Sequence, residues 1–220
     1  MAKVKISKKS TRIDMTAMCD VAFLLLSFFI MTATAKQPEP KAVDAPASTI
    51  EQKLPEEGVA TITVGDKQVF FTIPGADVRK ETLKRMSAKY KIPFTEEEYN
   101  TFASMQGFGV PIGKLKSLMK LGVAERNKPG LQEGIPYDSL NNELFDWIKE
   151  ARNANKSLRD GELTEGEIDV ETFAKKGDLQ IAIKGDAQED YPTIKRVMDI
   201  LQDQKKNKFY LVTGLRDENF

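Results

Sequence analysis

Residues 15–35 read MTAMCDVAFLLLSFFIMTATA, and only one of these residues, Asp20, is acidic or basic. The other polar side chains are hydroxyls. As an α-helix with a rise of about 1.5 Å per residue, the stretch is about 32 Å long, enough to cross the roughly 30 Å hydrocarbon core of a bilayer. No later stretch is comparably long and apolar. The sequence therefore predicts a single transmembrane helix over residues 15–35.

The charges on either side of this stretch predict its orientation. Residues 1–14 hold five basic side chains, which all precede the one acidic residue, Asp14. Positively charged flanks remain in the cytoplasm, so we expect a cytoplasmic basic tail and a periplasmic C-terminal part. Residues 36–220 carry 28 basic and 31 acidic side chains with no basic concentration, so we do not expect a nucleic-acid partner.

A cleaved signal peptide is the alternative reading of the same segment. It has a basic start, an apolar middle, and Ala33-Thr34-Ala35 as a small-residue cleavage site. The apolar region of a signal peptide is normally uncharged, and Asp20 lies where this apolar run begins. The position of that carboxyl group favours a retained helix.

Four polar residues of the segment share one helix face. At about 100° per residue they fall within roughly 40° of one another: Thr16, Asp20, Ser27 and Thr34. A charged side chain at the bilayer centre costs about 3 kcal/mol on insertion scales and usually marks a function. Apolar surroundings favour the neutral form of a carboxyl group, so Asp20 is a candidate proton carrier. In the competing structural reading, Asp20 caps a shorter helix that begins at Val21.

The part after the helix divides into a linker and a folded domain. Residues 36–58 contain four prolines among charged and small residues, which predicts an extended linker that reaches on the order of 70 Å. The pattern of strands and helices expected over residues 59–220 predicts an α+β domain. Its first two strands, 60–64 and 68–73, flank the turn Gly65-Asp66-Lys67 and form a hairpin. A strand at 179–183, an amphipathic helix at 191–204 and a strand at 209–213 form a strand–helix–strand unit with parallel strands.

A large helical insertion, about 76–160, separates these two parts. Its expected helices span 76–89, 95–105, 113–121 and 137–155, the last with this apolar face: Leu140, Leu144, Trp147 and Ile148. Five further apolar residues are expected to form a satellite core: Phe102, Phe108, Leu115, Leu118 and Met119. Gly107-Phe108-Gly109 lacks the ending of a phosphate-binding loop and is interpreted as a hinge. Residues 153–167 are expected to be exposed and mobile.

The start of the last helix holds two further candidate site residues, Asp186 and Tyr191. In the structural reading, Asp190 caps the helix, Pro192 lies in its first turn and Tyr191 packs at its start. In the functional reading, Asp186 and Tyr191 contact a partner protein.

Composition excludes several kinds of active site. The chain has no histidine and a single cysteine, Cys19, so it has no imidazole metal site, no His-based triad and no internal disulfide. We expect no metal and no cofactor. A hydrolase would need paired carboxyl groups in an apolar pocket, whereas these carboxylates lie in solvated charge runs: Glu96, Glu97, Glu98, Glu165 and Glu167. We therefore do not expect an enzyme.

Two segments resemble a known family. Residues 13–29, IDMTAMCDVAFLLLSFF, resemble the N-terminal signature of the ExbD/TolR family of biopolymer transport proteins, including the spacing from Thr16 to Asp20. Residues 186–191 and 197–201 resemble the start of that family's last helix. The sequence differs from the family pattern at Asp14, often Asn, and at Ala17, usually Pro.

The resemblance implies a subunit of a proton-driven inner-membrane motor. Such a single-pass protein forms a homodimer inside a ring of an ExbB/TolQ-like multi-span protein and acts on a TonB-like energy transducer, with peptidoglycan as a further candidate partner. It implies that Asp20 binds the proton and that Thr16 lies one turn before it, able to hydrogen-bond. The alternative function is a membrane-anchored periplasmic binding module, for example for peptidoglycan, without proton coupling.

Overall fold

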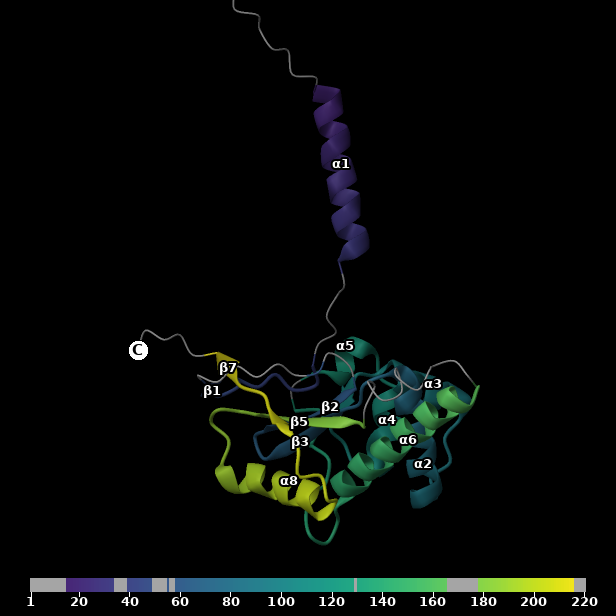
Figure 1. The fold of residues 1–220 in the computed structure, drawn as a ribbon, viewed down its shortest axis with the longest axis vertical. Coiled ribbons are helices and arrows are strands. Elements are labelled where there is room, and N and C mark those ends of the chain that lie inside the picture. The colour runs from purple at the N-terminus through teal and green to yellow at the C-terminus, as the bar shows by residue number, and fades with distance from the viewer. Residues whose placement is uncertain are drawn as a thin grey trace, which may run out of the picture. The chain divides into compact units, whose positions relative to one another are not determined.

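The computed structural model describes residues 15–33, 39–48, 55, 58–128, 130–165 and 178–215 (Figure 1). The chain forms two compact units, Met1–Gln37 and Pro38–Phe220. The described part of the first unit is the helix α1 (Met15–Thr32) and Ala33, and the helix has a mean hydropathy of 1.9 and no buried residue. This helix is long and apolar enough to cross a membrane, although a signal sequence meets the same criterion.

The second unit is built on a five-stranded mixed sheet in the order β4-β3-β2-β5-β6. Its strands are β2 (Val59–Gly65), β3 (Gln68–Thr72), β4 (Gly107–Phe108), β5 (Gln180–Gly185) and β6 (Tyr210–Leu211). The predicted hairpin is confirmed by the antiparallel pairing of β2 with β3. The predicted strand–helix–strand unit is confirmed as well, since β5 and β6 are parallel and α8 (Tyr191–Asp203) connects them. A separate two-stranded sheet pairs β1 (Ala47–Ser48) with β7 (Gly214–Leu215) in parallel.

The helices between β3 and β5 follow the sequence prediction in part. They are α2 (Ala76–Tyr90), α3 (Glu96–Ser104), α4 (Ile112–Met119), α5 (Val123–Arg126) and α6 (Glu143–Glu165). The prediction of a helix over 137–155 placed both ends wrongly. The expectation that residues 153–167 are exposed is confirmed for residues 153, 156, 157, 160 and 161 and wrong for Ala154, which is fully buried. The helix α6 continues through this stretch to Glu165. Leu140 precedes α6 and is fully exposed, so its assignment to the apolar face was wrong too.

One hydrophobic core joins the sheet to the helices. In Figure 1, α8 and the first turns of α6 lie on the same side of the sheet. Buried side chains of both helices share a cluster with β2, β3 and β5; the helical members include Leu144, Trp147, Ile148, Val197 and Leu201. The five expected satellite residues belong to this same cluster, so the prediction of a separate core was wrong. The ring of Phe108 shows why, since its centroid lies 4.6 Å from that of Trp147 and 6.4 Å from that of Phe71.

The segment interpreted as a hinge is the edge strand β4. Its residues pair with β3, Phe108 with Phe71 and Gly107 with Thr72. Gly109 is then held on both sides, because its N–H donates to Gln132 Oε1 at 2.6 Å and its carbonyl accepts from the N–H of Gly134 at 2.7 Å. The hinge interpretation was therefore wrong.

A buried carboxylate joins α4 to α6. Glu143, only 6% exposed, begins α6, and its Oε2 accepts a hydrogen bond from the backbone N–H of Ile112 at 2.8 Å. Burial raises the pKa of Glu143, and the nearby charge of Asp146 raises it further, while the hydrogen bonds from Ile112 and Asn141 oppose the shift.

We predict that Gly109→Ala destabilises the second unit by about 1–3 kcal/mol, because the added methyl group overpacks the core. An ideal Cβ at residue 109 would lie 2.1 Å from Cδ1 of Phe70, a side chain that is 2% exposed. The control is Gly113→Ala in α4, where an added Cβ meets nothing within 4 Å. It should be neutral or stabilising by up to about 1 kcal/mol. Urea unfolding of the full chain, followed by fluorescence of the single tryptophan, Trp147, measures both. Equal stabilities of the two variants would contradict the prediction.

We predict that Glu143 makes stability fall as the pH rises. The folded state holds this proton more tightly than the unfolded chain, because the folded-state pKa is raised. Ionising this buried carboxyl group costs folding stability. This loss of stability is absent below the unfolded-state pKa and complete above the folded-state pKa. Glu143→Gln keeps an acceptor for Ile112 and removes the titration. In urea midpoints measured across this pH window, wild type should lose stability relative to the variant as the pH rises. A constant difference across the window would refute this.

Candidate functional site

The first candidate site is the polar face of α1. Because α1 begins at Met15, Asp20 lies inside the helix, and the reading of Asp20 as an N-cap was wrong. The regular helix brings Thr16, Asp20 and Ser27 to one side, at about 100° per residue. The hydroxyl of Ser27 donates to the carbonyl oxygen of Leu24 at 2.9 Å. Thr34, the fourth predicted member, lies outside the described residues.

Asp20 is exposed, as is nearly all of α1 within the described chain. The helix thus presents one carboxyl group on an otherwise apolar rod. In a membrane, such a group requires a partner, a hydrated crevice or a proton. The chemistry available at this face is uptake and release of a proton.

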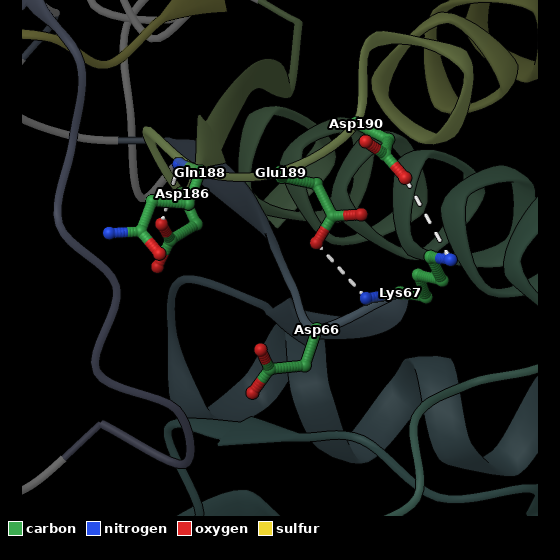
Figure 2. A pocket seen from close by; sticks show the side chains of 6 residues that line it. All are labelled: Asp66, Lys67, Asp186, Gln188, Glu189 and Asp190. Carbon is green, nitrogen blue, oxygen red and sulfur yellow. Dashed lines mark hydrogen bonds and ion pairs between the residues drawn. The ribbon is translucent and has the colours of Figure 1, made fainter.

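The second candidate site is a shallow depression of about 350 Å³ on the second unit (Figure 2). It lies where the β2–β3 turn meets the loop between β5 and α8, and it carries four carboxylates and one ammonium group. Its lining residues are Asp66, Lys67, Asp186, Gln188, Glu189 and Asp190. The net negative charge suits a cationic group.

Contacts from distant segments hold the β2–β3 turn in place. Asp66 and Lys67 both have positive φ, 53° and 58°, which is the twist that a two-residue hairpin requires but is uncommon outside glycine. The backbone N–H of Lys67 donates to Glu189 Oε2 at 3.0 Å. The backbone carbonyl of Lys67 accepts from the Tyr137 hydroxyl at 3.2 Å. In Figure 2, Glu189 and Asp190 both point toward Lys67. Sequence analysis missed Lys67, Glu189 and Tyr137, because residues so far apart in the chain leave no local pattern.

Tyr137, which donates to this turn, is partly buried beside acidic groups, and both conditions affect its pKa. Burial raises the pKa of Tyr137, and the charges of Asp138 and Glu189 raise it further, whereas Arg196 and Thr193 oppose the shift. Tyr137 therefore stays neutral and remains a donor to Lys67.

Asp186 shapes the loop as well as lining the depression. Its backbone N–H donates to the Val64 carbonyl at 2.9 Å, and its Oδ1 accepts from the N–H of Gln188 at 2.9 Å. Tyr191 is 66% exposed and does not line the depression. The expectation that Tyr191 packs at the start of the helix was therefore wrong.

Asp190 occupies the N-cap position of α8, as expected, with Pro192 in the first turn. Its side chain, however, makes no capping hydrogen bond. Instead, Asp190 Oδ2 lies 3.8 Å from Lys67 Nζ. Among the residues that the structure describes, no group of three or more Cys, Asp or Glu side chains is arranged to hold a metal ion.

Comparison with known proteins gives one match. The model of the family described as Biopolymer transport protein ExbD/TolR matches residues 7–215. No curated protein and no solved structure matches the chain.

We predict that removing two helix caps has unequal effects. Thr95→Ala should cost about 1 kcal/mol, because Thr95 Oγ1 accepts from the N–H of Glu98 in a reciprocal capping box at α3. Asp190→Ala should cost about 0.5 kcal/mol or less, because it removes only a long, exposed ion pair. Urea unfolding of both variants tests this. Equal losses would show that Asp190 caps α8 in solution.

Proposed function

Because the chain belongs to the ExbD/TolR family of biopolymer transport proteins, we propose that it harnesses the proton-motive force in an inner-membrane motor. Members of this family are non-enzymatic components of energy-coupled transport, anchored in the inner membrane. In the proposal, this chain is the single-pass subunit of an ExbB–ExbD-like or TolQ–TolR-like complex and energises a transport or envelope process.

The observation that carries the proposal is the position of Asp20. It is the only acidic or basic side chain of α1, five residues inside a helix long enough to cross a bilayer. An ionisable residue at such a position is a functional candidate by default. Each elementary charge that moves through 100 mV supplies about 2.3 kcal/mol, so repeated protonation provides usable energy.

The extent of the family match supports the view that α1 stays attached to the second unit and is not removed as a signal peptide. The match begins at residue 7 and continues to residue 215, so α1 and the second unit belong to one family pattern. A cleaved signal peptide would separate them. With the basic residues of the tail in the cytoplasm, the second unit lies in the periplasm.

In the proposed motor, Asp20 takes up and releases the proton. Thr16 and Ser27 lie on the same face and supply hydroxyl groups toward the same neighbour, and Thr34 continues this face in the sequence. A carboxyl group in lipid needs polar company, which an ExbB/TolQ-like multi-span ring and a second copy of this chain would provide.

The second unit transmits the effect of proton passage. Its acidic depression, with Asp186 in the lining and Tyr191 exposed nearby in sequence, is the proposed contact surface for a TonB-like energy transducer. Charge supports this assignment, because four carboxylates against one ammonium group favour a cationic segment. Peptidoglycan remains a further candidate partner of this unit.

We predict that Asp20→Asn abolishes proton-gradient-dependent activity at unchanged membrane abundance, because the amide cannot carry the proton. Asp20→Glu should retain part of the activity. Ser27→Ala is the matched control on the same face and should reduce activity less than Asp20→Asn. The measurement is gradient-dependent uptake or envelope integrity in cells that lack the native protein. Full activity of Asp20→Asn would favour an anchored binding module without proton coupling.

A further inference from the structure

An apolar turn interrupts the polar face of α1. Asp20 and Ser27 lie on this face, about 10 Å apart along the helix axis. The residues that the helix brings to the same side between them are Phe23 and Leu24, at about 40° and 60° around the axis from Ser27. Both side chains are apolar and exposed. The carboxyl group and the serine hydroxyl are therefore separated by side chains that offer water no hydrogen bond.

Phe23 is the larger of these two side chains and the closer to the middle of the face. It projects from the helix, with 69% of its surface exposed. Aromatic side chains of an α-helix point back toward the N-terminus and cover the turn that precedes their own Cα. That turn holds Asp20, about 4.5 Å earlier along the axis. The ring of Phe23 therefore stands on the Ser27 side of Asp20.

Polar groups lie on both sides of this ring. Asp20 precedes it, and the hydroxyl of Ser27 follows it. The Ser27 hydroxyl donates its proton to the carbonyl oxygen of Leu24 at 2.9 Å, which leaves its oxygen as an acceptor for water. A hydrophobic constriction between two hydrated sections gates by losing its own water.

We propose that Phe23 is a gate that keeps water on the Ser27 side of α1 from reaching Asp20. The inference rests on the proposed function, because the gate closes only where this face lies against a polar-lined partner. A proton then cannot pass Asp20 by diffusing along a resting helix. The ring of Phe23 has to move aside first, which requires α1 to turn or shift. The gate thereby links proton passage to movement of the helix.

The native thiol of Cys19 reports directly on this gate. Cys19 is the single cysteine of the chain and is exposed on α1. It precedes Phe23 by one turn and lies about 40° around the axis from it, which is the Asp20 side of the gate. Only the thiolate reacts with thiol reagents, so a thiol that water does not reach is protected.

The first test uses spheroplasts of the native host, in which the full chain is assembled with its natural partners. The probe is a membrane-impermeant, positively charged methanethiosulfonate, added outside. Cys19 should react slowly in wild type, and Phe23→Ala should speed its reaction by about tenfold or more, because water then fills the opened turn. Phe23→Leu keeps an apolar side chain of similar reach and should stay protected.

The matched control is Phe29→Ala, which removes the same ring from a position about 160° around the axis from Ser27. Phe29 is 58% exposed, close to the value for Phe23. Its loss should leave Cys19 protected. In a chain with Cys19→Ser, Ser27→Cys should react whether or not Phe23 is present. Equal rates for Cys19 in wild type and in Phe23→Ala would overturn the proposal, and so would an unreactive Ser27→Cys.

The second test measures proton leak in the same cells with a cytoplasmic pH-sensitive fluorescent protein after an external acid pulse. Phe23→Ala should acidify the cytoplasm severalfold faster than wild type or Phe29→Ala. Adding Asp20→Asn to Phe23→Ala should abolish the excess leak. An excess leak that persists without the carboxyl group would overturn the gate. Absence of a leak in Phe23→Ala, with Asp20→Asn still inactive, would refute the gate alone, whereas full activity of Asp20→Asn would refute the proposed function.

Discussion

The proposed function depends on one physical constraint, which is the cost of placing a carboxyl group in hydrocarbon, where water is excluded. The helix Met15–Thr32 carries one carboxyl group, and hydrocarbon offers that group neither hydrogen bonds nor counter-charge. In the proposed membrane setting, Asp20 therefore faces protein or confined water. Residues Thr16 and Ser27 add polar groups on the same side. In the proposed motor, a polar-lined ring supplies the polar groups that a solitary helix in lipid would lack.

In the proposed motor, the second unit receives and transmits force. Its core extends from the sheet through Trp147 and the aromatic rings around it.

Sequence analysis predicted those elements whose signals are local. Alternating β-branched residues on both sides of Asp66-Lys67 predicted the hairpin, and the amphipathic helix after Asp190 predicted the parallel strand pair. Its errors have one physical cause, which is contact between distant segments. Gly107–Gly109 looks like a hinge until β3 pairs with it, and Leu140 fits an apolar face only if the helix begins before Glu143.

The candidate sites also differ in how far the sequence alone could predict them. Asp20 was found because a charge inside an apolar run is visible in the sequence alone. The depression around Asp186 was found only in part, because Lys67 and Tyr137 reach it from segments whose contacts no spacing rule predicts. For Asp190, the position was predictable, but its side chain contacts Lys67 instead of capping α8.

The most direct measurement is infrared difference spectroscopy of the full chain, assembled in lipid with the proposed ExbB/TolQ-like ring partner, during acid–base cycles. A protonated carboxylic acid has a C=O stretch that a carboxylate lacks. The account predicts a band that appears and disappears with pH in wild type, shifts in Asp20→Glu and is missing from Asp20→Asn. An identical spectrum for wild type and Asp20→Asn would mean that this carboxyl group does not exchange protons, which contradicts the central claim.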